Sequence, residues 1–210
     1  MYYHVCMPLI VPKLSSLVKY HSWIFTVILR AIFQNTSSEV VKENDGNTTI
    51  LGIPTESTLL EFGLLSDGDF DAQRATYKIL KVEPFNSFRK KMSVLVGLLD
   101  GGVQAFCKGV SKIVLKLCNK VIDPNGTVVD FSDEQAKNVS DIINGFASEA
   151  LRTLCLAAKD VNESLGETSI PEDGYTLIVI VGIKDPVRPG VKICSNLLSC
   201  WNNCPHGYRW

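Results

Sequence analysis

The sequence predicts an α+β domain in which helices pack on an antiparallel sheet of about six strands. Three observations support this prediction. Residues 92–98 alternate like a half-buried strand, and residues 103–107 return as its partner after the Asp-Gly-Gly turn at 100–102. Residues 175–183 form a β-branched run that is typical of a buried strand. Residues 132–135, Ser-Asp-Glu-Gln, form a capping box that opens a helix.

The first third of the chain predicts one helix or strand, then a hairpin, then a helix. Residues 23–33 include a short apolar run, but neither this run nor the proline-broken residues 1–12 approach the ~20 apolar residues of a membrane span. No basic region precedes a clean apolar run, so we expect no signal peptide. A turn at 44–47 joins two β-like runs. Pro54 then opens a helix, since proline is tolerated in a first helical turn and the acid of Glu56 suits the helix dipole.

The remaining elements follow in chain order. We expect an acidic, solvated loop at 66–71, a strand at 77–82 and a helix over residues 110–121, where apolar residues recur at helical spacing. The capped helix should continue to about residue 152, and a strand should cover residues 153–159. The Asp-Pro-Val-Arg-Pro-Gly run after the last strand is too stiff to continue it.

Composition and missing motifs exclude several classes of function. A net charge of −1 implies no general attraction to nucleic acid or to anionic membranes. The seven cysteines are scattered, which indicates a reducing compartment rather than a disulfide framework. P-loop, Rossmann, GxSxG and HExxH motifs are absent. The three histidines, at positions 4, 21 and 206, lie outside the patterned region, which excludes a His-dependent triad within the domain.

Two features of the central region are hard to explain by core packing. Phe85, Arg89 and Lys90 lie between two predicted strands, where an aromatic ring and cations face solvent or a ligand. Lys108 and Gly109 lie where a strand is expected to end and a helix to begin, and the free N–H groups of a helix start suit an anion. Together these residues predict a nucleotide pocket. The alternative is that the charge run Arg-Lys-Lys at 89–91 is a solvated turn and that Lys108 is a strand-end charge.

The tail at 194–210 offers a second candidate ligand site. Cys194, Cys200, Cys204 and His206 are zinc-ligating residue types, but their spacing lacks a CxxC pair. A zinc-binding fragment that uses this tail is therefore an alternative function. No metal site is predicted elsewhere in the chain.

Five sequence pieces occur together in a specific order. They are Gly-Ile-Pro-Thr-Glu-Ser at 52–57, Val-Glu-Pro-Phe-Asn-Ser-Phe-Arg-Lys-Lys-Met-Ser-Val at 82–94, Phe-Cys-Lys-Gly at 106–109, Ala-Leu-Arg-Thr-Leu-Cys-Leu-Ala at 150–157 and Gly-Ile-Lys-Asp-Pro-Val-Arg-Pro-Gly-Val at 182–191. In this order and spacing the chain resembles the nucleotide-binding (N) domain of P-type ATPases. It is most similar to the plant autoinhibited calcium pumps of the plasma-membrane type. The resemblance covers roughly three quarters of the chain.

The resemblance implies that the ligand is ATP, and Mg-ATP in the full-length family. In that family the N domain holds ATP and delivers its γ-phosphate to an aspartate in a neighbouring domain. By matched motif, Phe85 would stack on adenine and Glu56 would lie at the adenine edge. Lys90 and Lys108 would line the purine pocket and reach toward the phosphates, and Arg152 would contact the phosphate chain. No catalytic residue is implied within the domain itself.

The chain departs from the family in several places. The Asp-Lys-Thr-Gly-Thr phosphorylation motif, the downstream magnesium motifs and the membrane helices are absent. We therefore expect neither phosphoenzyme formation nor calcium transport from this chain alone. Lys112 replaces an acid that the family usually has on the first helical turn, which is unfavourable with the helix dipole. An interaction module that has lost nucleotide binding is therefore a further alternative.

The resemblance also implies a division of the chain. Residues 31–184 would form the nucleotide-binding domain, and residues 185–193, with Asp185 and Arg188, would be a hinge toward a missing phosphorylation domain. The parent family consists of integral proteins of the plasma membrane or endomembranes, and this domain faces the cytosol there.

Both ends lose the resemblance. Residues 1–30 and 194–210 are atypical segments outside it. We therefore expect the chain to be a truncated or mis-spliced gene product that retains the N domain.

Overall fold

The structure is a computed structural model that describes residues 5–6, 22–42, 48–66, 68–123, 126–161 and 169–184. The helices are α2 (Ser22–Gln34), α3 (Pro54–Leu65), α4 (Phe70–Thr76), α5 (Ser111–Val114), which the 3₁₀ turn η1 (Leu115–Leu117) follows, and α6 (Asp133–Ser148). The strands are β1 (Val5–Cys6), β2 (Glu39–Lys42), β3 (Thr48–Leu51), β4 (Lys78–Asn86), β5 (Lys91–Gly97), β6 (Val103–Val110), β7 (Cys118–Ile122), β8 (Val128–Asp130), β9 (Arg152–Val161) and β10 (Tyr175–Ile183).

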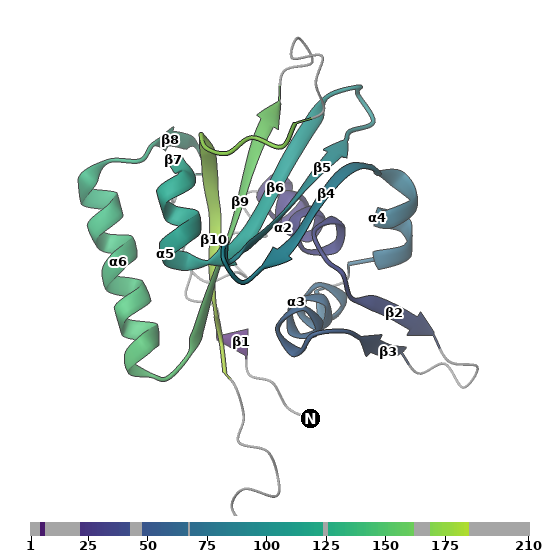
Figure 1. Cartoon of the computed structure of the whole chain (residues 1–210), viewed down its shortest axis with the longest axis horizontal. Coiled ribbons are helices and arrows are strands. Elements are labelled where there is room, and N and C mark those ends of the chain that lie inside the picture. Colours follow the sequence, from purple (N-terminus) through teal and green to yellow (C-terminus); the bar gives the residue numbers. More distant parts are fainter. Residues whose placement is uncertain are drawn as a thin grey trace, which may run out of the picture.

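The described elements form an α+β fold built on one large sheet, which confirms the predicted class (Figure 1). Seven strands follow the order β4-β5-β6-β9-β10-β7-β8, and β1 pairs with the far end of β10, so the sheet has eight strands rather than about six. Its described pairs are antiparallel except β7 with β10. β2 and β3 form a separate two-stranded sheet.

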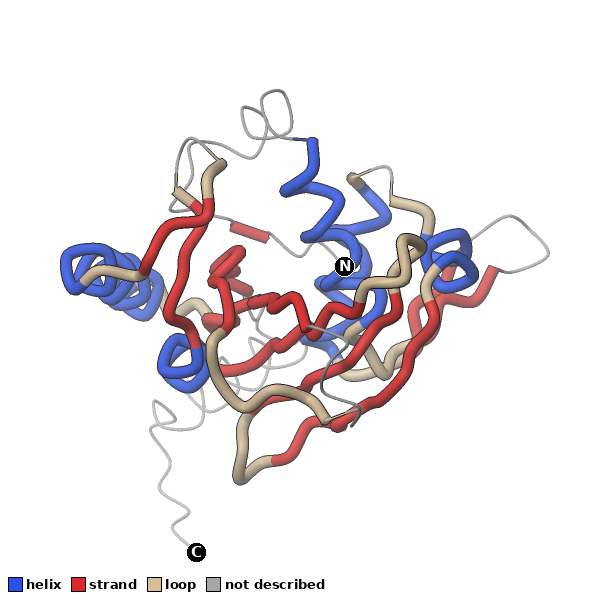
Figure 2. The backbone as a smooth tube through the Cα atoms, turned by 90° about the horizontal axis from the view of Figure 1, so that it is seen from above, coloured by secondary structure: helices blue, strands red, loops and turns tan. Residues whose placement is uncertain are grey.

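Helices cover both faces of the sheet, and each face has its own apolar cluster. α2, α3 and α4 lie on one face, and α5 and α6 lie on the other (Figures 1 and 2). Strand residues alternate between the clusters. Val94, Val96 and Phe106 face α2 and α3, whereas Leu95 and Ala105 face α5 and α6. The sheet is therefore the middle layer of three.

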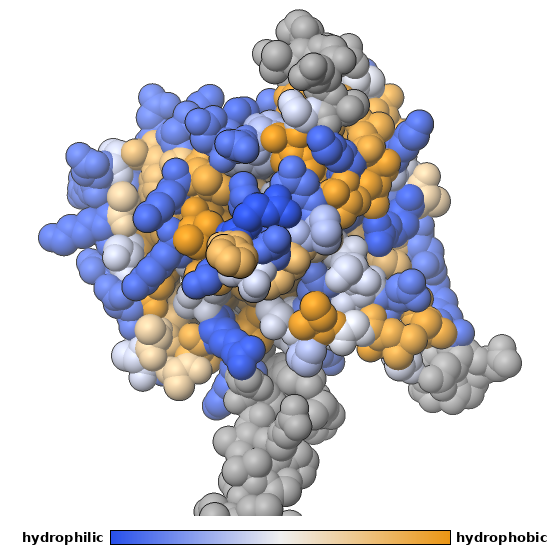
Figure 3. Space-filling view, viewed as in Figure 1, coloured by the Kyte–Doolittle hydropathy of each residue, from blue (hydrophilic) through white to orange (hydrophobic). Residues whose placement is uncertain are grey.

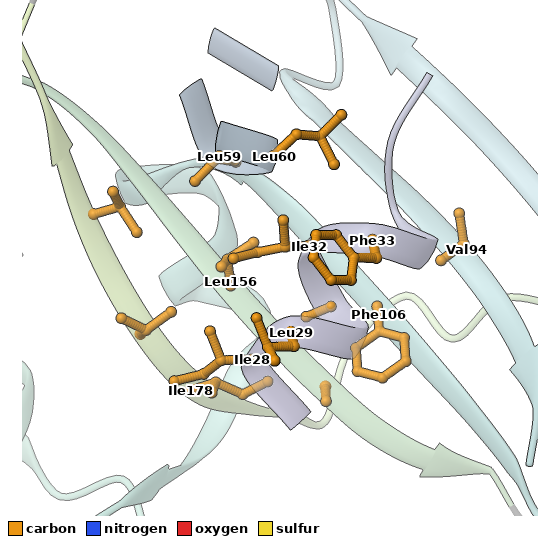
Figure 4. Close-up of a cluster of buried hydrophobic side chains, with 14 of the residues drawn as sticks. Ile28, Leu29, Ile32, Phe33, Leu59, Leu60, Val94, Phe106, Leu156 and Ile178 are labelled. Atoms are coloured by element: carbon orange, nitrogen blue, oxygen red, sulfur yellow. The ribbon is translucent and has the colours of Figure 1, made fainter. Parts of the chain in front are cut away.

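Helix α2 supplies the centre of the first cluster. Ile24, Ile28, Leu29, Ile32 and Phe33 are buried at helical spacing, and Figure 4 shows the last four beside side chains of α3 and of the sheet. Of the two structures predicted for residues 23–33, the helix is therefore the one formed. It begins inside the N-terminal segment assigned to residues 1–30 and continues past it.

Several local predictions are confirmed. The β5–β6 hairpin and the buried strand β10 form as expected. In the capping box at the start of α6, the Gln135 backbone N–H donates to the Ser132 hydroxyl (3.3 Å), and the Ser132 N–H donates to Gln135 Oε1 (2.9 Å). These features depend on neighbouring residues alone.

Three predicted elements end earlier than expected. The helix expected over residues 110–121 lasts only through α5 and η1, because residues 118–122 pair with β8 and β10 as a strand. The acidic loop expected at 66–71 is shorter than predicted, because α4 begins at Phe70 and Asp69 caps it by accepting from the Ala72 N–H (3.0 Å). α6 ends at Ser148 rather than near residue 152, since Ala150 takes a left-handed conformation (φ 56°) that no helix continues.

Candidate functional site

The aromatic and cationic residues predicted for the ligand site lie at the connection between β4 and β5. Phe85, near the end of β4, leaves 55% of its surface exposed, and Lys90 is exposed at the end of the turn. Arg89 pairs with Glu83 and donates to the Pro84 carbonyl oxygen (3.2 Å), so this member of the charge run is engaged locally. Figure 3, in the same view as Figure 1, shows hydrophobic residues surrounded by hydrophilic residues on the face that carries the β4–β5 turn.

Lys108 lies inside a strand rather than at a strand end. β6 continues to Val110, and Lys108 is the register partner of Met92 on β5. Its side chain is buried, with 6% of the residue exposed. The expectation that Lys108 marks a helix start is therefore wrong, because α5 begins only at Ser111 and has four residues.

Gly109 allows the β4–β5 turn and β6 to approach one another closely. A Cβ built at Gly109 would lie 2.5 Å from the Lys90 carbonyl oxygen and 2.8 Å from the Lys91 Cα. The Val110 N–H donates to that same Lys90 carbonyl oxygen (3.1 Å). Because Gly109 has no side chain, the turn that carries Lys90 packs directly against the strand that carries Lys108.

Glu56 and Lys108 form a buried ion pair. Glu56 lies on the first turn of α3, and its Oε1 is 2.6 Å from Lys108 Nζ. Only 7% of Glu56 is exposed. Burial alone would raise the pKa of Glu56, but the Lys108 ammonium and the hydrogen bonds from Ser37 outweigh burial and lower that pKa to about 2. Glu56 is therefore a carboxylate at any physiological pH.

Sequence reasoning missed the residues that surround the Glu56 carboxylate. Thr36, Ser37 and Ser38 all donate to its Oε2, and Ser37 does so with both its backbone N–H (3.0 Å) and its hydroxyl (2.6 Å). The run of hydroxyl residues directly after an apolar helix is the one sequence signal that could have indicated them.

Arg152 lies at the same end of the sheet as the other candidates. It is the first residue of β9 and is exposed. Leu154, two residues on, is the register partner of Val110 at the end of β6. The register therefore gathers four strand ends at one edge: the end of β4, the start of β5, the end of β6 and the start of β9. All five predicted ligand-site residues belong to this edge or, for Glu56, contact a residue near it.

Some predicted residues lie outside the described part of the chain. These are the hinge residues Asp185 and Arg188 and the possible zinc ligands of the tail, Cys194, Cys200, Cys204 and His206. Within the described ranges, no group of three or more His, Cys, Asp or Glu side chains is arranged to hold a metal ion.

Cys107, Cys118 and Cys155 are free thiols in the second apolar cluster. Cys107 and Cys155 are buried, and Cys118 is half-buried. Burial raises the pKa of Cys118 and of Cys155 to about 12, so neither is a thiolate at neutral pH. These cysteines are packing residues rather than nucleophiles.

Sequence comparison identifies the family. Residues 25–190 match the family described as P-type ATPase, cytoplasmic domain N. The chain belongs to this family. The match begins inside α2 and includes the β4–β5 turn, the Glu56–Lys108 pair and Arg152.

Relatives of this P-type ATPase N domain are plant proteins named as calcium-transporting ATPases. Calcium-transporting ATPase 4, plasma membrane-type, of Arabidopsis thaliana is 61% identical over 168 residues, which cover 80% of this chain and 16% of that protein. Putative calcium-transporting ATPase 11, plasma membrane-type, of Arabidopsis thaliana is 60% identical over 166 residues, which cover 79% of this chain and 16% of that protein. Probable calcium-transporting ATPase 9, plasma membrane-type, of Oryza sativa subsp. japonica is 51% identical, with 86% and 17% covered. The chain thus spans about a sixth of the length of these curated relatives.

None of the helices in the described residues is both long enough and apolar enough to cross a membrane.

Proposed function

We propose that this N domain binds ATP at the sheet edge formed by β4, β5, β6 and β9. One observation supports the proposal above the others. An exposed aromatic ring and exposed cations lie at the edge where a carboxylate that is ionised at physiological pH is held beside a lysine. This combination offers a stacking surface, a hydrogen-bond acceptor and positive charge, which are the three needs of a purine nucleotide.

Each predicted residue has a role that its surroundings allow. Phe85 stacks on the adenine ring, since more than half of the residue is exposed to solvent. Glu56 accepts a hydrogen bond from the adenine amine. Lys108 lines the purine pocket, but Glu56 neutralises its charge, so Lys90 and Arg152 supply most of the attraction for the phosphates.

The wider function is that of the cytosolic nucleotide-binding domain of a calcium-transporting P-type ATPase, which uses Mg-ATP. The names of the relatives and the identity with them support this proposal. Residues 185–193, with Asp185 and Arg188, would then form the hinge toward a phosphorylation domain. The Asp-Lys-Thr-Gly-Thr motif is absent from the 210 residues, so we expect no phosphoenzyme and no transport from this chain alone.

Titration of ATP against the full chain tests the proposal. We expect weak, saturable binding by calorimetry or by NMR shifts, without turnover. A base stacked on an aromatic ring is worth roughly 1–3 kcal/mol, so Phe85→Ala should weaken ATP binding about tenfold or more. The matched control is Phe88→Ala, which removes a ring that is 96% exposed at the tip of the same turn.

Two outcomes would contradict the proposal. Absence of saturable binding up to millimolar ATP would favour the alternative of an interaction module that no longer holds nucleotide. Equal losses of ATP affinity in Phe85→Ala and Phe88→Ala would show that the turn as a whole, and not a base stacked on Phe85, determines the affinity.

A further inference from the structure

Residues 35–38, Asn-Thr-Ser-Ser, connect α2 to β2. They contact strands β5 and β6 on one side and the Glu56 carboxylate on the other. Asn35 Nδ2 donates to the carbonyl oxygens of Met92 on β5 (3.3 Å) and Phe106 on β6 (3.5 Å). Because Met92 is the register partner of Lys108, Asn35 fixes the segment against the two strands that position the site lysine.

The other three residues of the segment converge on one oxygen of Glu56. Oε2 lies 2.6 Å from the Ser37 hydroxyl and 3.0 Å from the Ser37 backbone nitrogen, but 3.3 Å from the hydroxyls of Thr36 and Ser38. A carboxylate oxygen has two lone pairs, so the two short contacts satisfy it. Ser37 therefore supplies the main bonds, and Oε1 is left for Lys108.

The loop before α3 lies directly against the same segment. A Cβ built at Gly52 would overlap the Ser38 side chain, so only glycine allows this close approach. Four residues further along, the chain reaches Glu56 on the first turn of α3. The segment is thus held between the sheet and the helix that present the two charges of the site.

We propose that Ser37 is a positioning residue of the nucleotide site, which holds Oε2 of Glu56 so that Oε1 faces Lys108 and the adenine amine. This inference rests on the proposed function and deepens it. A carboxylate oxygen fixed in this position accepts a hydrogen bond from the amine of adenine and repels the carbonyl oxygen that guanine has at the same ring position. Ser37 thereby sets the preference for ATP over GTP without contacting the ligand.

Affinities for ATP and GTP, measured on the full chain, test this role. Ser37→Ala removes a hydrogen bond to a charged group. It should therefore weaken ATP binding about fivefold or more and reduce the ATP-to-GTP preference by a similar factor. Ser37→Thr keeps a hydroxyl and should restore both values. The control is Thr58→Ala, which removes a different hydroxyl from α3, one that donates to the Pro54 carbonyl oxygen (2.8 Å). Thr58→Ala should lower the melting temperature but leave the preference unchanged.

A second measurement does not depend on nucleotide. Carboxyl ¹³C NMR should give a pKa of about 2 for Glu56 in the unaltered chain. In Ser37→Ala the pKa of Glu56 should rise above about 3, whereas in Ser37→Thr it should stay as low as in the unaltered chain. If Ser37→Ala does not fold, Ser37→Gly removes the same hydroxyl and replaces it in both measurements.

The outcomes separate the two proposals. If the unaltered chain binds ATP and Phe85→Ala weakens that binding, but Ser37→Ala changes neither the pKa of Glu56 nor the ATP-to-GTP preference, the role of Ser37 is overturned and ATP binding stands. If the unaltered chain binds no ATP, the proposed function fails. The selectivity role then fails with it, even if Ser37→Ala shifts the pKa of Glu56. A shifted titration together with a reduced preference, both restored by threonine, supports the inference.

Discussion

Replacement of Lys108 with methionine would leave the Glu56 carboxylate buried without its cation. The pKa of Glu56 lies at about 2 in the folded chain, against an ordinary value of 4.5. At about 1.36 kcal/mol for each pKa unit, the interactions of this carboxylate contribute about 3 kcal/mol to the free energy of unfolding at neutral pH. Part of this shift comes from the Ser37 hydrogen bonds, and burial lowers the pKa of Lys108 itself, so the shift of Glu56 is not the contribution of the ion pair alone. A buried pair that loses one partner typically costs ~3–5 kcal/mol. We therefore expect Lys108→Met to lower stability at pH 7 by about 3 kcal/mol.

The stability difference between the unaltered chain and Lys108→Met should depend on pH. A carboxylate with a depressed folded pKa stabilises the fold above its unfolded pKa, and this stabilisation is lost as pH falls from about 4.5 to about 2. Without Lys108, burial of Glu56 raises its pKa again, so the variant loses less stability on acidification. The stability gap between the two chains should therefore narrow as the pH decreases through this window.

Urea unfolding at pH 7, 4 and 3 measures the gap. The matched control is Lys112→Met, because Lys112 is an exposed lysine on the neighbouring helix and its removal should change stability by no more than about 0.5 kcal/mol. Glu56→Gln combined with Lys108→Met should recover part of the loss, since no buried charge remains. A gap equal to that of the control at pH 7, or a gap that stays constant on acidification, would refute the reasoning.

Two further predictions concern the helix after β6 and the N-terminal boundary. Lys112→Glu should change the free energy of unfolding by no more than about 0.5 kcal/mol, because α5 is a single turn in which Lys112 lies as near the last carbonyl groups as the first N–H groups, and a larger change in urea unfolding would contradict this. A chain shortened to begin at Ala31 should melt several degrees below the full chain, because it loses Ile24 and Ile28, whose buried side chains are each worth ~1.5–3 kcal/mol. An unchanged melting temperature would show that the boundary expected at residues 30 and 31 is the edge of the folded unit.

The sequence by itself determined the features that depend on neighbouring residues. The hairpin of β5 and β6 follows from alternation around a glycine turn, and the start of α6 follows from the cap at Ser132. The run 175–183 has no polar face and so predicted a buried strand. The motifs also determined the family, since five short pieces in a fixed order are rarely shared by chance.

The tertiary structure decided the features that join distant parts of the chain. Residues 118–122 have helical spacing, yet they form β7 because β8 and β10 offer hydrogen bonds on both sides. No local rule links Ser37, Glu56 and Lys108, which belong to a loop, a helix and a strand. Only the packing of α2 and α3 on the sheet brings them together, and burial then requires that the two charges be paired and hydrogen-bonded.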